Sequence, residues 1–98
     1  MMTVHWSPRA DETYGEILEY LSLQWGLEVT IGFMDEVEQT IELIRKFPRM
    51  FEASPSHPTI RKGFITKHTT LFYEIKDDTI ELLVFWNNRR NPDDLNVS

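Results

Sequence analysis

The sequence predicts an α+β fold: an N-terminal strand, an antiparallel helix hairpin, and a three-stranded antiparallel meander, which together form a twisted sheet covered by helices on one face. Apolar residues recur every three or four positions in the first half of the chain and every second position from Thr59 onward. A proline-containing loop over residues 48–58 separates the two patterns. The 98 residues, 41% of them hydrophobic, are expected to form one domain over 1–98.

The first elements expected are a short strand over residues 3–6 and a helix that Ser7 caps and Pro8 begins. Gly26 stands where a left-handed helix end is expected, and a second helix then runs to Pro48. Two helices with so short a connection pack as an antiparallel hairpin. The apolar stripes are Ala10, Tyr14, Ile17, Leu18, Leu21 and Trp25 on the first helix, and Val29, Phe33, Val37, Ile41, Ile44 and Phe47 on the second.

Three strands are expected next, over residues 60–66, 70–76 and 79–86. Gly63 suggests a bulge or bend in the first of them. Asp77 and Asp78 suggest a tight turn between the other two. The N-terminal strand is expected beside one of these strands, and the sequence does not specify which one.

Strict alternation along the last strand predicts which side chains face the helices. It places Ile80, Leu82, Val84 and Trp86 on one face. Leu83 and Phe85 then project from the opposite face, together with Phe72 of the preceding strand. That opposite face is too apolar to be plain solvent surface, so a partner is expected to cover it, with Phe72 and Phe85 as binding residues.

Composition excludes several classes of protein. The net charge of −6 argues against a general polyanion binder, and the absence of cysteine excludes disulfide scaffolds and thiolate metal sites. No apolar run is long enough for a membrane helix, and the N-terminus does not resemble a signal peptide, so a cytoplasmic protein is expected. His5, His57 and His68 lack metal-ligand spacing, and the glycines form no phosphate-binding loop. We therefore expect no metal and no cofactor.

Two basic clusters in the second half are candidate sites. Arg61 and Lys62 lie in one strand, and Lys67 and His68 follow it, a grouping that suits phosphate binding beside a proton carrier. Charged strand ends that discourage edge pairing explain the same residues equally well. The second cluster follows the last strand and offers planar donors for phosphate or carboxylate, or for ion pairs that fasten the tail. It consists of Asn87, Asn88, Arg89 and Arg90.

The order of these elements and motifs resembles the RelE/ParE superfamily of toxin–antitoxin toxins, in the branch called plasmid stabilisation proteins. The resemblance covers nearly the whole chain. It is carried by Val4-His5-Trp6-Ser7-Pro8-Arg9-Ala10, Phe47-Pro48, Ile60-Arg61-Lys62, Leu71-Phe72-Tyr73-Glu74-Ile75, Val84-Phe85-Trp86 and Asn88-Arg89-Arg90-Asn91-Pro92.

The resemblance implies a toxin that a cognate antitoxin neutralises, with either DNA gyrase, as for ParE, or ribosome-bound mRNA, as for RelE, as its target. For the mRNA-cleaving members it implies basic side chains that hold the scissile phosphate and stabilise the transition state. Arg89 matches the family arginine after the last strand, Lys67 and Arg61 fall among the basic sheet residues, and His68 is a candidate proton carrier.

Three positions depart from the mRNA-cleaving members. Thr70 stands where they have an arginine, Asn87 where some relatives have a histidine, and Leu95 where they have a catalytic tyrosine. These departures favour a ParE-like target over mRNA. A ribosome-dependent endoribonuclease, and a relative that has lost toxicity and acts only as a binding partner, are the two alternative hypotheses.

Overall fold

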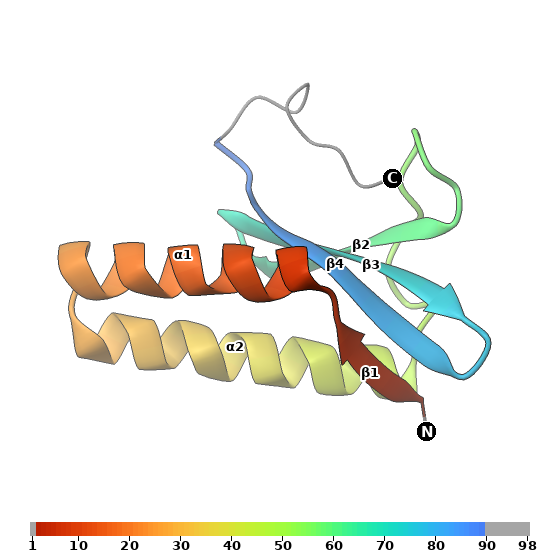
Figure 1. Ribbon diagram of the computed structural model, residues 1–98, viewed down its shortest axis with the longest axis horizontal. Coiled ribbons are helices and arrows are strands. Elements are labelled where there is room, and N and C mark those ends of the chain that lie inside the picture. The colour runs from red at the N-terminus through yellow and green to blue at the C-terminus, as the bar shows by residue number, and fades with distance from the viewer. Residues whose placement is uncertain (1, 90–98) are drawn as a thin grey trace.

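The computed structural model describes residues 2–89 and confirms the predicted α+β fold. An antiparallel helix hairpin lies across one face of a twisted sheet (Figure 1). The elements are β1 (Thr3–Trp6), α1 (Pro8–Gln24), α2 (Leu27–Lys46), β2 (Ile60–Thr66), β3 (Thr69–Lys76) and β4 (Thr79–Asn87).

The sheet order β1-β4-β3-β2 shows where the N-terminal strand joins the sheet. β2, β3 and β4 form the predicted antiparallel meander, and β1 pairs in parallel with β4. The backbone N–H groups of Thr3 and Ser7 donate to Asp78 O and Leu82 O, at 2.9 and 3.1 Å. A parallel neighbour is possible here because the helix hairpin, β2 and β3 separate β1 from β4 in sequence.

The helix ends form as their sequences predict. The Ser7 side chain accepts a hydrogen bond from Ala10 N at 3.0 Å, and Pro8 occupies the first turn, where a backbone N–H has no partner in the helix. Gly26 has a φ of +90°, a conformation that residues with a Cβ rarely adopt, and its N–H donates to Leu21 O. The chain therefore reverses between the helices within two residues.

A bulge in β4 overturns the predicted alternation. Phe72 pairs with Val84 and Tyr73 with Leu82, so Leu83 is an extra residue and the side chains beyond it change faces. Phe85 was expected on the face away from the helices, and this was wrong: it is 3% exposed in the helix-side core. Val84 and Trp86 were expected toward the helices; they pack instead with Ile60 and Phe72 in a second buried cluster.

Polar side chains from the start of the chain satisfy the backbone of this bulge. Ser7 Oγ donates to Leu83 O at 3.0 Å, and the N–H of Phe85 donates to Thr13 Oγ1 of α1, also at 3.0 Å. Such contacts are needed because a bulge interrupts the hydrogen-bond ladder and leaves buried backbone groups without strand partners.

We expect Thr13→Val to lower the free energy of unfolding by about 1–3 kcal/mol, because it keeps the side-chain shape and removes the acceptor of the Phe85 N–H. Thr13→Ser keeps the hydroxyl and serves as the matched control. Urea unfolding followed by circular dichroism measures both variants. Equal stabilities for the valine and serine variants would contradict the assigned role of Oγ1.

Gly63 permits close packing rather than a bulge, so the predicted bulge there was wrong. It pairs in regular register with Leu71, and the irregularity of β2 falls between Phe64 and Thr66. A Cβ at position 63 would lie 3.3 Å from Ile44 Cδ1 and 3.6 Å from a ring atom of Phe51. The absence of a side chain lets α2 and the following loop approach the strand.

The helix hairpin is longer than the sheet face that it covers. The connection between α1 and α2 lies well beyond the sheet (Figure 1). Apolar residues expected in the core therefore remain in solvent where the sheet ends: Trp25 is 65% exposed and Val29 46%. Neither helix among the described residues combines the length and hydrophobicity needed to span a membrane.

Candidate functional site

The groove beneath the overhanging part of the hairpin is the candidate functional site, and we call it the overhang groove. It has a volume of about 830 Å³, apolar walls from both helices, and polar side chains at the end nearest the sheet. Its lining consists of Thr13, Glu16, Ile17, Tyr20, Leu21, Trp25, Val29, Gly32, Phe33, Glu36, Thr66, His68, Thr69, Phe85, Asn87 and Arg89.

Asn88 organises the sheet end of the groove. Its backbone N–H donates to His68 O at 2.8 Å, and its side-chain amide donates to Lys67 O at 3.3 Å. Its side-chain oxygen accepts from Thr70 Oγ1 at 2.9 Å. Thr70, which stands where mRNA-cleaving relatives have an arginine, thus helps to fasten the end of β4 to the turn between β2 and β3.

This fastening brings His68 and Arg89 together across 21 residues of sequence. Arg89 Nη2 lies 3.3 Å from His68 Nε2, and because a guanidinium can only donate, Nε2 is the acceptor and the imidazole is neutral. Desolvation, with the positive charges of Arg89 and Lys67, lowers the pKa of His68 below its ordinary value. The pair therefore presents a fixed cation beside a neutral base.

The other predicted basic residues do not join this pair as one phosphate-binding set. Lys67 adjoins His68 in the turn, but Arg61 lies about 17 Å back along β2 from Thr66 at the usual strand rise. The Arg61 guanidinium donates to Phe51 O at 2.6 Å and to Arg49 O at 3.3 Å, so it holds the loop after α2.

Lys62 is likewise outside the groove. It pairs with Phe72, whose side chain belongs to the cluster on the sheet face away from the helices. Only Lys67, His68 and Arg89 of the predicted basic residues within 2–89 therefore gather at one place.

The remaining predicted site residues have different surroundings. Asn87 lines the groove and accepts a hydrogen bond from Arg89 N at 2.9 Å. Phe85 also lines the groove, whereas Phe72 is 7% exposed in the second cluster, so the exposed apolar patch expected of them is not present. Arg90 and Leu95 lie outside the described residues.

Sequence reasoning missed the helix side of the groove. Glu16 and Glu36 fit an ordinary solvent-facing helix surface, and Gly32 has no pattern that distinguishes it. Tyr20 was the available signal, because this large aromatic residue lies outside the predicted apolar stripe and is 54% exposed.

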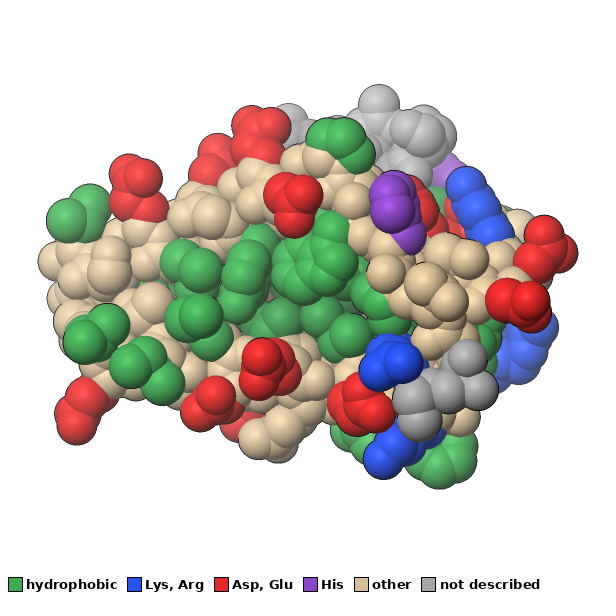
Figure 2. Space-filling view, turned by 60° about the horizontal axis from the view of Figure 1, so that its bottom comes forward, with side chains coloured by type: hydrophobic (Ala, Val, Ile, Leu, Met, Phe, Trp, Pro, Cys, Tyr) green, Lys and Arg blue, Asp and Glu red, His purple; other side chains and the backbone are tan. Residues whose placement is uncertain are grey.

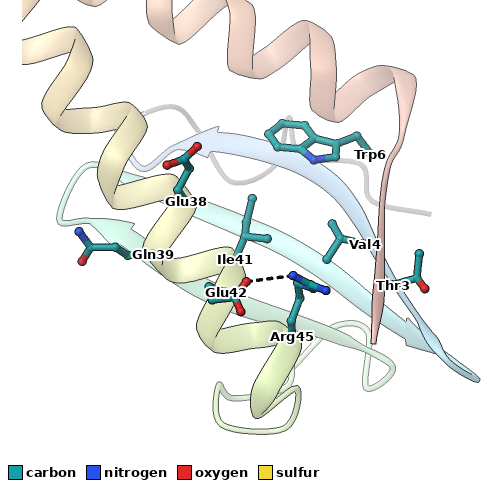
Figure 3. Close-up of a pocket in the computed structure, with 8 residues that line it drawn as sticks. All are labelled: Thr3, Val4, Trp6, Glu38, Gln39, Ile41, Glu42 and Arg45. Carbon is teal, nitrogen blue, oxygen red and sulfur yellow. Dashed lines mark hydrogen bonds and ion pairs between the residues drawn. The ribbon is translucent and has the colours of Figure 1, made fainter. Parts of the chain in front are cut away.

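A second hollow, of about 800 Å³, lies between α2 and β1 (Figure 3). The side chains of Val4, Trp6 and Ile41 border it. Its one cationic group is already engaged, because Arg45 pairs with Glu42 at 3.0 Å and donates to Met2 O at 3.1 Å. This arrangement fastens α2 to the N-terminal segment. The only cationic side chain of the hollow is therefore engaged within the protein and does not offer a binding group for a ligand.

Acidic side chains flank the apolar surface of the hairpin. Figure 2 shows hydrophobic side chains gathered along the hairpin with acidic side chains on both sides. Residues 8–46 contain nine acidic and three basic residues. Within residues 2–89, no three His, Asp or Glu side chains gather as metal ligands.

A comparison with models of known protein families identifies the family of this chain. A family model described as the ParE toxin of the type II toxin–antitoxin system parDE matches residues 4–92. The chain belongs to the ParE toxin family. The ParE toxin described here is therefore a type II toxin, and the resemblance found in the sequence is confirmed.

Solved structures show the same fold at low sequence identity. A chain from the chromosomal ParDE system of P. aeruginosa is 15% identical with a TM-score of 0.75, covering 89% of this chain and 96% of that one. A copper-bound mutant toxin from Helicobacter pylori is 17% identical with a TM-score of 0.67, covering 91% and 97%.

A chain of the YoeB–YefM complex from Staphylococcus aureus is also similar. It is 13% identical with a TM-score of 0.61, covering 87% of this ParE toxin and 94% of that chain. No curated protein sequence matches the chain. The fold is thus shared with toxins described by several names.

Proposed function

We propose that this ParE toxin is neutralised by an antitoxin protein and that its cellular target is DNA gyrase. The character of the overhang groove supports a protein target. Apolar side chains of both helices form its walls, and its helix side carries Glu16 and Glu36. Such a surface suits a protein partner, whereas a nucleic-acid site needs cations along its length to neutralise phosphates.

The dispersed basic residues support the same proposal. Cleavage of mRNA requires several cations around one scissile phosphate. Arg61 here hydrogen-bonds loop carbonyls, and Thr70 replaces the arginine of the mRNA-cleaving relatives. The antitoxin partner is supported by the family itself and by structurally similar chains that were solved in toxin–antitoxin complexes, the YoeB–YefM complexes from Staphylococcus aureus.

The second candidate function is mRNA cleavage, which the contact between His68 and Arg89 favours. When Arg89 turns from His68 Nε2 to a phosphate oxygen, the freed nitrogen of the neutral imidazole could accept a proton from a ribose 2′-OH while the guanidinium stabilises phosphate charge. A variant pair tests this role, because His68→Ala removes the base and Arg89→Ala removes the cation.

Pulse labelling of DNA and protein synthesis after induction of the chain alone distinguishes the two targets. For gyrase, we expect DNA synthesis to fall first and both variants, His68→Ala and Arg89→Ala, to keep most of that effect. For mRNA, protein synthesis falls first, and each variant loses about 10²-fold or more in cleavage. If the chain affects neither process, or if co-expression with the product of the adjacent reading frame does not restore growth, the proposed function is wrong.

A further inference from the structure

The sheet face away from the helices, which we call the far face, carries an apolar cluster that is almost fully buried. The cluster consists of Ile60 from β2, Phe72 from β3, and Val84 and Trp86 from β4. Their exposed fractions are 4%, 7%, 0% and 5%. An antiparallel sheet with helices on one side leaves its other face in water unless something covers it. These low exposures therefore require further atoms above the cluster.

The helices and strands do not provide this cover. Both helices lie across the opposite face of the sheet (Figure 1). The loop between α2 and β2 follows the edge of β2, where Ser54 N donates to Ile60 O at 2.6 Å and Lys62 N donates to Glu52 O at 3.0 Å. Such hydrogen bonds between neighbouring extended segments lie in the plane of the sheet rather than above it. Within residues 2–89, no helix or strand lies over the far face.

Residues 90–98 begin close to the cluster in sequence and are numerous enough to cross it. They start four residues after Trp86. Thr70 pairs with both Trp86 and Phe64, so Trp86 and Ile60 are two strands and four residues apart in the sheet. This separation is about 16 Å at the usual strand spacing and rise. Nine extended residues reach about 30 Å, so the segment is long enough to pass over all four side chains.

The composition of this segment suits an apolar surface on one side only. Leu95 and Val97 are two positions apart, so both project from the same side of an extended backbone. The polar residues Asn96 and Ser98 project from the opposite side. Pro92 disfavours a helical conformation at the residue before it, which favours an extended backbone. An extended segment with this sequence can thus present apolar side chains to the cluster and polar ones to solvent.

We propose that the far face binds the chain's own last nine residues, which lie across Phe72 and Val84 as an extended strap. The cluster is buried within a single chain, so no second copy and no other protein is needed to cover it. The family match ends at residue 92, so most of the strap lies beyond the part shared with the family. The strap hides an apolar surface that would otherwise promote association with other proteins. This proposal does not rest on the proposed function.

A paramagnetic label on the full-length protein tests the position of the strap. The chain has no cysteine, so Asn96→Cys gives a single attachment site for a nitroxide, on the side opposite Leu95 and Val97.

We expect the backbone amide signals of Phe72 and Val84 to lose most of their intensity beside the nitroxide. The signals of Asp35 and Gln39, which are exposed on α2 beyond the other face of the sheet, should keep theirs. Reduction of the nitroxide should restore the lost signals. Equal losses at the two places, or no loss at either, would overturn the proposal.

A mixture of two preparations distinguishes a strap from a contact between two chains. One preparation is isotope-labelled and lacks the nitroxide, and the other carries the nitroxide and no isotope. A strap within one chain leaves the signals of Phe72 and Val84 unchanged in this mixture. Loss of these signals in the mixture would show that one chain covers another, and the proposal would be wrong.

Charged substitutions test the apolar side of the strap. Leu95→Asp with Val97→Asp places two charges against the cluster, whereas Asn96→Asp with Ser98→Asp adds the same charge on the opposite side. The first double variant should raise the fluorescence of anilinonaphthalene sulfonate at least about twofold, because this dye binds exposed apolar surface. It should also lower the urea midpoint of unfolding, while the second double variant leaves both quantities unchanged. Equal behaviour of the two double variants would overturn the proposal.

Discussion

Phe85→Ala is expected to lower the free energy of unfolding by about 3–5 kcal/mol. Phe85 is 3% exposed, and its ring centroid lies 5.4 Å from that of Trp6 and 5.2 Å from that of Tyr14. The substitution opens a cavity where β1, α1 and β4 meet, and it removes two aromatic contacts. Urea unfolding of the wild type and the variant measures the loss.

Phe64→Ala is the matched control, because it removes the same side chain from a neighbouring part of the sheet. Phe64 is 57% exposed, so its removal should cost less than about 1 kcal/mol. Strict alternation along β4 would place Phe85 at an exposed binding surface, which implies similar small losses for both variants. Similar losses of stability in Phe85→Ala and Phe64→Ala would therefore contradict the position of Phe85 in the core between the sheet and the helices.

A tyrosine in the core gives the protein a specific sensitivity to alkali. Tyr73 is fully buried, and its hydroxyl donates to Pro48 O at 2.8 Å. Burial raises the pKa of Tyr73 to about 12, although the nearby Arg61 charge and a backbone hydrogen bond oppose this rise. The unfolded chain ionises this group near pH 10, so the stabilisation present below pH 10 is lost as the pH rises to 12.

We expect this single group to remove about 2–3 kcal/mol of stability between pH 10 and 12. Tyr73→Phe lacks the ionisable hydroxyl and the hydrogen bond to Pro48. It should be about 1 kcal/mol less stable than the wild type at pH 8 and more stable at pH 12, so that the two stability curves cross between pH 10 and 12. Denaturant midpoints at intervals from pH 8 to 12 test this, and parallel curves would contradict it.

The sequence predicted elements whose signals are local. Ser7 and Pro8 marked the start of α1, Gly26 its end, and the repeat of two in the apolar pattern marked β2 to β4. The predicted alternation of faces was wrong from Leu83 onward, because an extra residue in a strand changes the strand pairing without any signal in the composition. The bulge depends on Ser7 and Thr13, which are more than 70 residues away in the sequence and could not be connected to it by any local pattern.

The candidate site was predicted only in part, for a related reason. His68 and Arg89 were both singled out, but their contact depends on Asn88, whose hydrogen bonds to the β2–β3 turn are tertiary. The overhang groove exists because the helices are longer than the sheet face that they cover. No individual residue in the sequence indicates this difference in length. Trp25 continued the helical stripe and was therefore expected in the core, although no strand lies beneath it.

The pairing of β1 with β4 also has a consequence for how the toxin is made. β1 is synthesised first, and its only strand partner within residues 2–89 is synthesised last. At about 5–20 residues per second, the N-terminal strand waits roughly 4–15 s on the ribosome before β4 exists. The sheet therefore closes only after β4 has been synthesised, and β1 has no strand partner within residues 2–89 while the helix hairpin, β2 and β3 are made.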